Sequence, residues 1–143
     1  MKFSDQEAVL YPYLALPKMR RCCIDQTGLG RQFAERAQER FGKYRVEGVQ
    51  FTALSKEKMA YPMRAKFEDK TIRIPDTPEI RADIRAVKKT VGAGGAIRFD
   101  AARSENGHSD RFWALALAVE AARTEGESYI TPVELERSRR FIW

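Results

Sequence analysis

Apolar residues recur along the chain at two kinds of spacing, which indicate helices and strands in turn. Phe33, Ala37 and Phe41 are four residues apart, the spacing that places side chains on one face of a helix. Residues 112–119 are nearly all apolar, which predicts a buried helix. Short apolar runs between turn-forming residues predict strands. The predicted helices cover residues 4–16, 31–41, 55–68, 78–87 and 109–124, and the predicted strands cover residues 19–24, 44–51, 71–74 and a hairpin around 91–99.

Proline and glycine interrupt this pattern at defined points. Pro12 and Pro62 lie inside predicted helices, where a missing N–H and a ring clash favour a kink. Gly42 is a suitable C-terminal stop for the second helix. The alternation of strands and helices predicts an α/β domain, a sheet with helices on its faces.

The chain has 143 residues, about the length of one domain. We find no internal repeat and no low-complexity segment. We therefore predict one domain over residues 1–126 and a short helical appendage over residues 127–143. In that appendage, Thr131-Pro132-Val133-Glu134 has the form of a capping box with proline at the first helical position.

The composition favours a soluble cytoplasmic protein. No apolar run approaches the roughly 18 residues of a membrane span, and the first residues do not resemble a secretory signal. The only cysteines, Cys22 and Cys23, are adjacent, and neighbouring residues of a strand point to opposite faces. We interpret them as reduced packing residues. A metal-ligand role has little support, since there is no second cysteine pair and only one histidine.

The net charge is +6 and the pI is about 9.5. Such an excess of Lys and Arg suits a polyanionic partner, because phosphate contacts release counterions. An ordinary basic surface explains the charge nearly as well. The cations form no dense tail, so a folded basic surface fits better than a disordered arm.

Asp25 is the first candidate for chemistry. It follows the apolar run Cys22-Cys23-Ile24 and precedes the turn Thr27-Gly28-Leu29-Gly30. Ligands of open α/β sheets bind at the carboxyl ends of strands, which is where Asp25 is predicted to lie. Capping of the turn is an equally good explanation from position alone. The glycines match neither the dinucleotide nor the Walker pattern, so we interpret them as a tight turn and keep a nucleotide site as a minor alternative.

Asp110 is the second candidate, at the start of the predicted apolar helix. A carboxylate in the first turn is stabilised in its charged form by the helix dipole. Simple capping by Ser109 and Asp110 is the alternative. His108 is placed either to orient Asp110 or to touch a phosphate, although a lone histidine is more often a polar loop residue. Two carboxylates at one sheet edge repel each other unless a cation lies between them, and oxygen ligands suit Mg²⁺ or Mn²⁺.

Three segments together resemble the nuclease domain of tailed-phage terminase large subunits, most closely the Mu-like prophage type. The resemblance covers about residues 1–123, and the order and spacing of its motifs are more specific than any one motif. The motifs are Ile24-Asp25-Gln26-Thr27-Gly28-Leu29-Gly30, Gly48-Val49-Gln50-Phe51-Thr52 with Ser55-Lys56, and Gly107-His108-Ser109-Asp110 before Ala114-Leu115-Ala116-Leu117-Ala118.

The resemblance implies a ribonuclease H-like fold, with a mixed sheet flanked by helices. It also implies cleavage of double-stranded DNA with two Mg²⁺ or Mn²⁺ ions. Asp25 matches the second acidic position of the family and Asp110 the last. We assign Lys56, His108 and Arg111 to nucleic-acid binding. The implied partners of the intact protein are DNA, the packaging ATPase domain, the small terminase subunit and the portal.

The family's first catalytic aspartate, on the first strand of its sheet, has no match in this sequence. We therefore expect an N-terminally truncated domain that lacks the opening strands. Its unpaired sheet edge favours a homodimer. The expected function is that of a terminase nuclease fragment, whose activity alone is uncertain. The alternative is a non-catalytic prophage remnant that binds DNA or a packaging protein.

Overall fold

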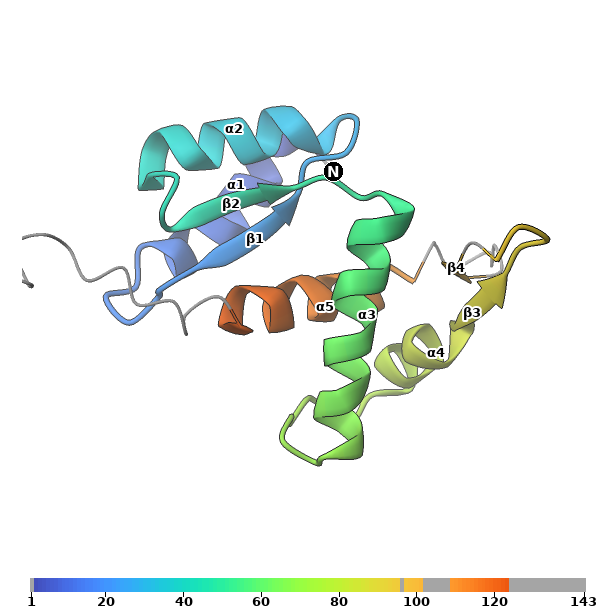
Figure 1. The fold of residues 1–143 in the computed structure, drawn as a ribbon. Helices are drawn as coiled ribbons and strands as arrows, with labels where there is room; N and C mark the ends of the chain where they lie inside the picture. The colour runs from blue at the N-terminus through green and yellow to red at the C-terminus, as the bar shows by residue number, and fades with distance from the viewer. Residues whose placement is uncertain (1, 96, 102–108, 124–143) are drawn as a thin grey trace, which may run out of the picture.

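The computed structural model describes residues 2–95, 97–101 and 109–123 (Figure 1). Helices and strands alternate through most of this part, as the hydrophobic pattern predicts. The helices are α1 (Phe3–Leu14), α2 (Gly30–Phe41), α3 (Ala53–Glu68), α4 (Pro78–Ala86) and α5 (Asp110–Arg123). The strands are β1 (Cys22–Asp25), β2 (Val46–Val49), β3 (Val87–Val91) and β4 (Ile97–Ala101).

The parallel pair β1–β2 is covered by helices on both faces. In Figure 1, α1 and α2 lie on one side of the pair and α5 on the other. The register aligns Cys22 with Val46 and Asp25 with Val49, so both strands end at the same edge. This arrangement has the form expected of a parallel strand pair, whose crossover is the helix α2.

The alternation of side chains along β1 divides the core into two clusters. Cys22 and Ile24 pack with the cluster of Leu14, Ala37 and Val46 beneath α1 and α2. Cys23 points the other way and joins the larger cluster formed mainly by α3 and α5. The prediction that the adjacent cysteines are free packing residues agrees with this geometry, since both are unpaired thiols.

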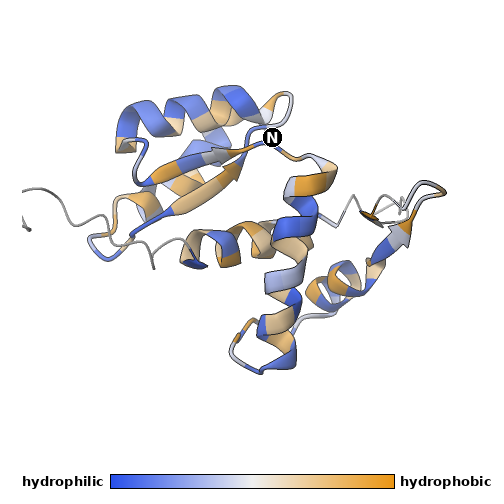
Figure 2. Cartoon of the chain, in the orientation of Figure 1, coloured by the Kyte–Doolittle hydropathy of each residue, from blue (hydrophilic) through white to orange (hydrophobic). Residues whose placement is uncertain are grey.

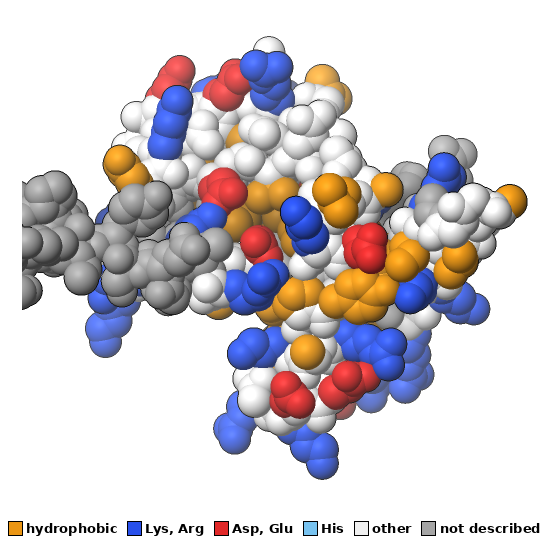
Figure 3. Space-filling model, in the orientation of Figure 1, with side chains coloured by type: hydrophobic (Ala, Val, Ile, Leu, Met, Phe, Trp, Pro, Cys, Tyr) orange, Lys and Arg blue, Asp and Glu red, His pale blue; other side chains and the backbone are white. Residues whose placement is uncertain are grey.

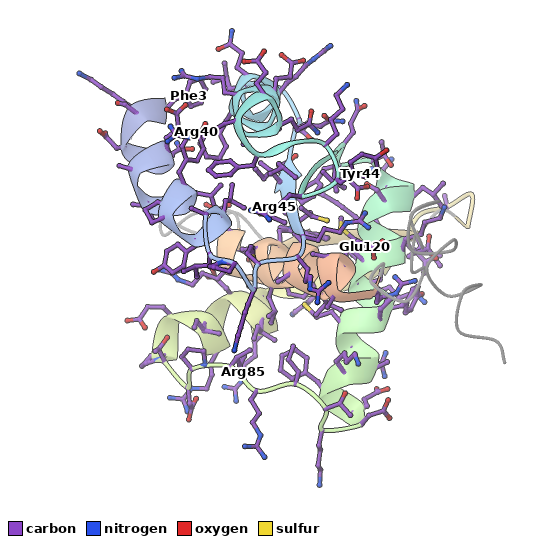
Figure 4. The ribbon with its side chains drawn as sticks, turned by 90° about the vertical axis from the view of Figure 1, so that its left-hand side faces the viewer. Phe3, Arg40, Tyr44, Arg45, Arg85 and Glu120 are labelled. Carbon is purple, nitrogen blue, oxygen red and sulfur yellow. The ribbon has the colours of Figure 1, made fainter. Side chains whose placement is uncertain are left out.

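Polar contacts tie α1 to the strand pair. The Arg45 guanidinium donates to the Leu14 carbonyl over 3.0 Å, which satisfies a backbone acceptor at the end of α1 (Figure 4). Arg36 of α2 forms an ion pair with Glu7 of α1. Polar residues cover the outer face of α2, as the hydropathy colouring shows (Figure 2).

The second half of the described chain packs around α5. Helix α3 crosses it, α4 lies beside its N-terminal end, and the antiparallel β3–β4 hairpin rests on α3. Tyr61 of α3 meets Phe99 of β4 edge to face, with the ring centroids 5.5 Å apart. The side chain of Lys89 in β3 lies over the same Tyr61 ring.

Three predictions of the fold need correction. The described strands form two separate two-stranded sheets, not one mixed sheet. Residues 71–74 form no strand, although their apolar pattern predicts one, because none of the strands in the described part of the chain forms a ladder with them. The helix predicted through Val87 stops at Ala86, and the β-branched Val87 begins β3.

Helices α1 and α3 continue through Pro12 and Pro62, and the kinks expected at these prolines stay predictions. None of the helices in the described ranges is both long and apolar enough to cross a membrane. The predicted capping box at residues 131–134 lies outside the described residues.

Candidate metal and nucleic-acid site

Asp25 is the last residue of β1 and is half-buried. One carboxylate oxygen, Oδ1, accepts the backbone N–H of Thr27 over 2.8 Å. This is the local turn bond expected of an aspartate before a turn. It fixes the carboxylate at the strand end and leaves Oδ2 available for another ligand.

The glycines after Asp25 are explained by the turn itself. Gly28 has a φ of 57°, a left-handed conformation that a side chain would disfavour. A Cβ built on Gly30 would overlap the carbonyl oxygen of Asp25, so only glycine permits this close approach. The predicted tight turn between strand and helix is therefore confirmed.

A chain of contacts connects Asp25 with three other elements. The Thr27 hydroxyl accepts the backbone N–H of Phe51, just beyond β2, over 2.9 Å. The Phe51 ring lies 5.4 Å from the Trp113 ring of α5, measured between centroids. The Lys56 ammonium nitrogen of α3 lies 4.8 Å from the Trp113 centroid and 5.8 Å from that of Phe51. The strand ends and the first turns of α3 and α5 thus meet in one region.

Asp110 is the first residue of α5, and its side chain is exposed. It follows Ser109, which is buried and has a φ of 58°. The Ser109 carbonyl accepts the N–H of Phe112 over 3.0 Å, so the helix starts directly after this bend. Asp110 therefore lies at the positive end of the helix dipole, as predicted.

The sequence did not predict the role of Asp83, which lies on another helix and accepts a backbone hydrogen bond from the first turn of α5. One of its carboxylate oxygens accepts the Arg111 backbone N–H over 3.1 Å and pairs with the Arg111 guanidinium over 3.3 Å. Asp83 belongs to α4, so no local pattern around Asp110 points to it. The predicted DNA-contacting Arg111 is consequently held by an internal ion pair, with its side chain still 52% exposed.

The two aspartates are brought to the same end of one packed unit. Helix α5 packs against β1, and the end of β1 and the start of α5 lie toward the same side of the molecule (Figure 1). Within the described ranges, however, no group of three His, Cys, Asp or Glu side chains is close enough to hold a metal ion. His108, assigned to the same region, lies outside the described residues.

The thiols are poorly suited to metal binding. Burial, with a smaller effect of the neighbouring Cys23, raises the pKa of Cys22 from 9.0 to about 11. Burial also raises the pKa of Cys23, although Arg21 partly opposes this shift. Burial therefore disfavours the thiolate form of both cysteines, the form in which a cysteine binds a metal.

Comparison with known proteins gives one result. The model of a family described as "Terminase RNaseH-like domain" matches residues 1–122. No curated protein and no solved structure matches the chain.

Proposed function

Because this chain belongs to the terminase RNaseH-like domain family, we propose that it is a metal-dependent nuclease domain that cuts double-stranded DNA during phage genome packaging. Asp25 and Asp110 are the carboxylates assigned to the metal site. The motif sequences quoted above favour the Mu-like prophage type within the family. The packaging ATPase domain, the small terminase subunit and the portal are the proposed partners.

The observation that supports this proposal best is the position of the two aspartates. One ends a parallel strand and the other begins the helix packed on that strand. The carboxyl end of a parallel sheet is where open α/β folds bind ligands. Thr27, Phe51 and Trp113 bridge the two positions through the contacts described above.

The chemistry of the two carboxylates suits a hard divalent cation. Asp25 retains a carboxylate oxygen not used by Thr27, and Asp110 is exposed to incoming ligands. Mg²⁺ is commonly held by one or two carboxylates together with water and substrate phosphates, so two aspartates suffice for weak binding. When bound, such an ion activates water and stabilises the leaving oxygen of a phosphodiester.

The chain's own cations would hold the DNA. The Lys56 ammonium lies over the ring of Phe51, whose backbone is hydrogen-bonded to Thr27 in the turn after Asp25. From this position the ammonium group would contact a phosphate. Figure 3 shows many Lys and Arg side chains around the lower end of α3, α4 and β3. The exposed cations of these elements and of the segment between them include Lys70, Arg81, Lys88 and Lys89. Contacts of this kind position a duplex without reading its sequence.

A homodimer through β1 is a further part of the proposal. In the described part of the chain, β1 forms a ladder with β2 alone, so its second edge has no strand beside it. Unpaired edges favour pairing between chains. Sedimentation velocity at several concentrations would test it, and a monomer throughout would remove this part of the proposal.

The nuclease proposal is tested by plasmid cleavage in Mn²⁺. We expect metal-dependent nicking that falls by about 10²-fold or more in Asp110→Asn and Asp25→Asn, because each removes charge from the metal site. Asp69→Asn, at an exposed position after α3, is the matched control and should cleave like the wild type. Cutting that survives both site substitutions would exclude these residues from the mechanism.

The second candidate function is DNA or protein binding without catalysis. It is favoured by the missing third potential ligand among the described side chains. A DNA affinity that falls steeply with salt but does not respond to Mn²⁺ would support it over the nuclease. Calorimetric titration with Mn²⁺ separates the two functions. The nuclease requires Mn²⁺ binding that Asp25→Asn weakens, whereas binding without catalysis does not.

A further inference from the structure

A cavity of about 380 Å³ lies between residues 115–123 of α5, the end of α3 and residues 71–74. Its floor is apolar and is formed by Ile72, Ile74, Leu115 and Val119. Asp110 is at the opposite end of α5, so this cavity is separate from the proposed metal site. Concave apolar sites with a few polar groups at the edge are the usual form of a binding site.

Residues 72–74, in the wall of the cavity, have no backbone hydrogen-bond partner among the described residues. Thr71 and Arg73 are exposed while Ile72 and Ile74 are half-buried, the alternation of a strand. The segment thus combines a strand-like side-chain pattern with donors and acceptors that a partner strand would satisfy.

The rim of the cavity is positively charged. Lys66, Arg73 and Arg123 line it, with no acidic residue among the lining side chains. Arg123 pairs with Glu120, but neither Lys66 nor Arg73 has an ion-pair partner among the described residues. Uncompensated cations around an apolar floor are complementary to a ligand that is both acidic and apolar.

We propose that this cavity binds an extended, acidic peptide segment of a partner protein. The peptide backbone pairs with residues 72–74, an apolar side chain enters the cavity, and carboxylates meet Lys66 and Arg73. DNA shares the negative charge but offers no side chain for an apolar floor. The cations alone would suit either ligand. The apolar floor formed by Leu115 and Val119 favours a peptide over DNA.

The test uses the full chain and a fluorescein-labelled dodecapeptide in which Glu alternates with Val and Phe. Fluorescence anisotropy should detect saturable binding, and a version with Lys in place of Glu should not bind. Arg73→Glu replaces attraction by repulsion at the rim and should weaken binding by about tenfold or more. Arg85→Glu makes the same charge change at an exposed position of α4 outside the cavity (Figure 4) and should stay within about twofold.

Amide hydrogen exchange adds a readout of the binding mode. The amides of Ile72, Arg73 and Ile74 should exchange more slowly when the peptide is bound, because they gain acceptors. If Arg73→Glu and Arg85→Glu weakened peptide binding equally, the effect would come from the overall charge of the protein, and the proposal would be overturned. Displacement of the peptide by equimolar duplex DNA would assign the site to DNA instead. Failure of the full chain to bind would also overturn it.

Discussion

The ammonium nitrogen of Lys56 lies 4.8 Å from the ring centroid of Trp113 and thereby joins the first turn of α3 to the first turn of α5. The two residues are far apart in sequence, and their elements pack across the larger core cluster. Phe51 completes the contact from the end of β2. Lys56 therefore has a structural role beside its proposed contact with DNA.

Lys56→Met should reveal the structural role. Methionine keeps an unbranched apolar stem but removes the cation, so the free energy of unfolding should fall by about 0.5–1 kcal/mol, as for a partly exposed cation–π contact. Urea denaturation measures that loss. Lys56→Arg retains the charge and should restore most of it, and a methionine variant as stable as the wild type would show that the contact contributes nothing.

Gly30→Ala should disrupt the junction of β1 and α2. Alanine normally favours a helix over glycine by about 1 kcal/mol, but here its Cβ would overlap the Asp25 carbonyl. The overlap requires backbone movement, so a net loss of about 2 kcal/mol is expected. Gly94→Ala, where a Cβ meets nothing within 4 Å, is the control and should be nearly neutral in thermal unfolding. Equal melting temperatures for the two variants would contradict the close approach.

Asp83→Asn should loosen the start of α5. The amide can still accept one bond, but the ion pair with Arg111 is lost and the helix end loses a negative charge, so about 1 kcal/mol of stability should disappear. A double-mutant cycle with Arg111→Met measures the coupling between the two side chains. No coupling energy above the measurement error would mean that the pair is incidental.

The raised pKa of Cys22 predicts a specific pH dependence. The folded state holds the thiol proton up to a pKa of about 11 and the unfolded chain only to about 9.0. The associated stability is therefore complete below pH 9 and is lost as the pH rises toward 11. Urea denaturation at several pH values should show a steeper alkaline decline for the wild type than for Cys22→Ala. Parallel declines would show that the thiol does not contribute.

Local pattern was sufficient for the features that depend on neighbours in sequence. The spacing of Phe33, Ala37 and Phe41 predicted α2, and the glycines after Asp25 predicted the turn that Gly28 and Gly30 make. The apolar run at residues 112–119 predicted most of α5. These features are determined by helix periodicity and backbone sterics, which operate within a few residues.

Only the tertiary structure decided the features that need a distant partner. Residues 71–74 have the pattern of a strand, yet a strand requires a neighbour, and the chain places α5 beside them instead. Asp83 caps α5 from α4, and Lys56 reaches Trp113 across the core. Such pairings depend on which surfaces meet when helices and strands pack, and the order of residues along the chain does not encode that by any local spacing.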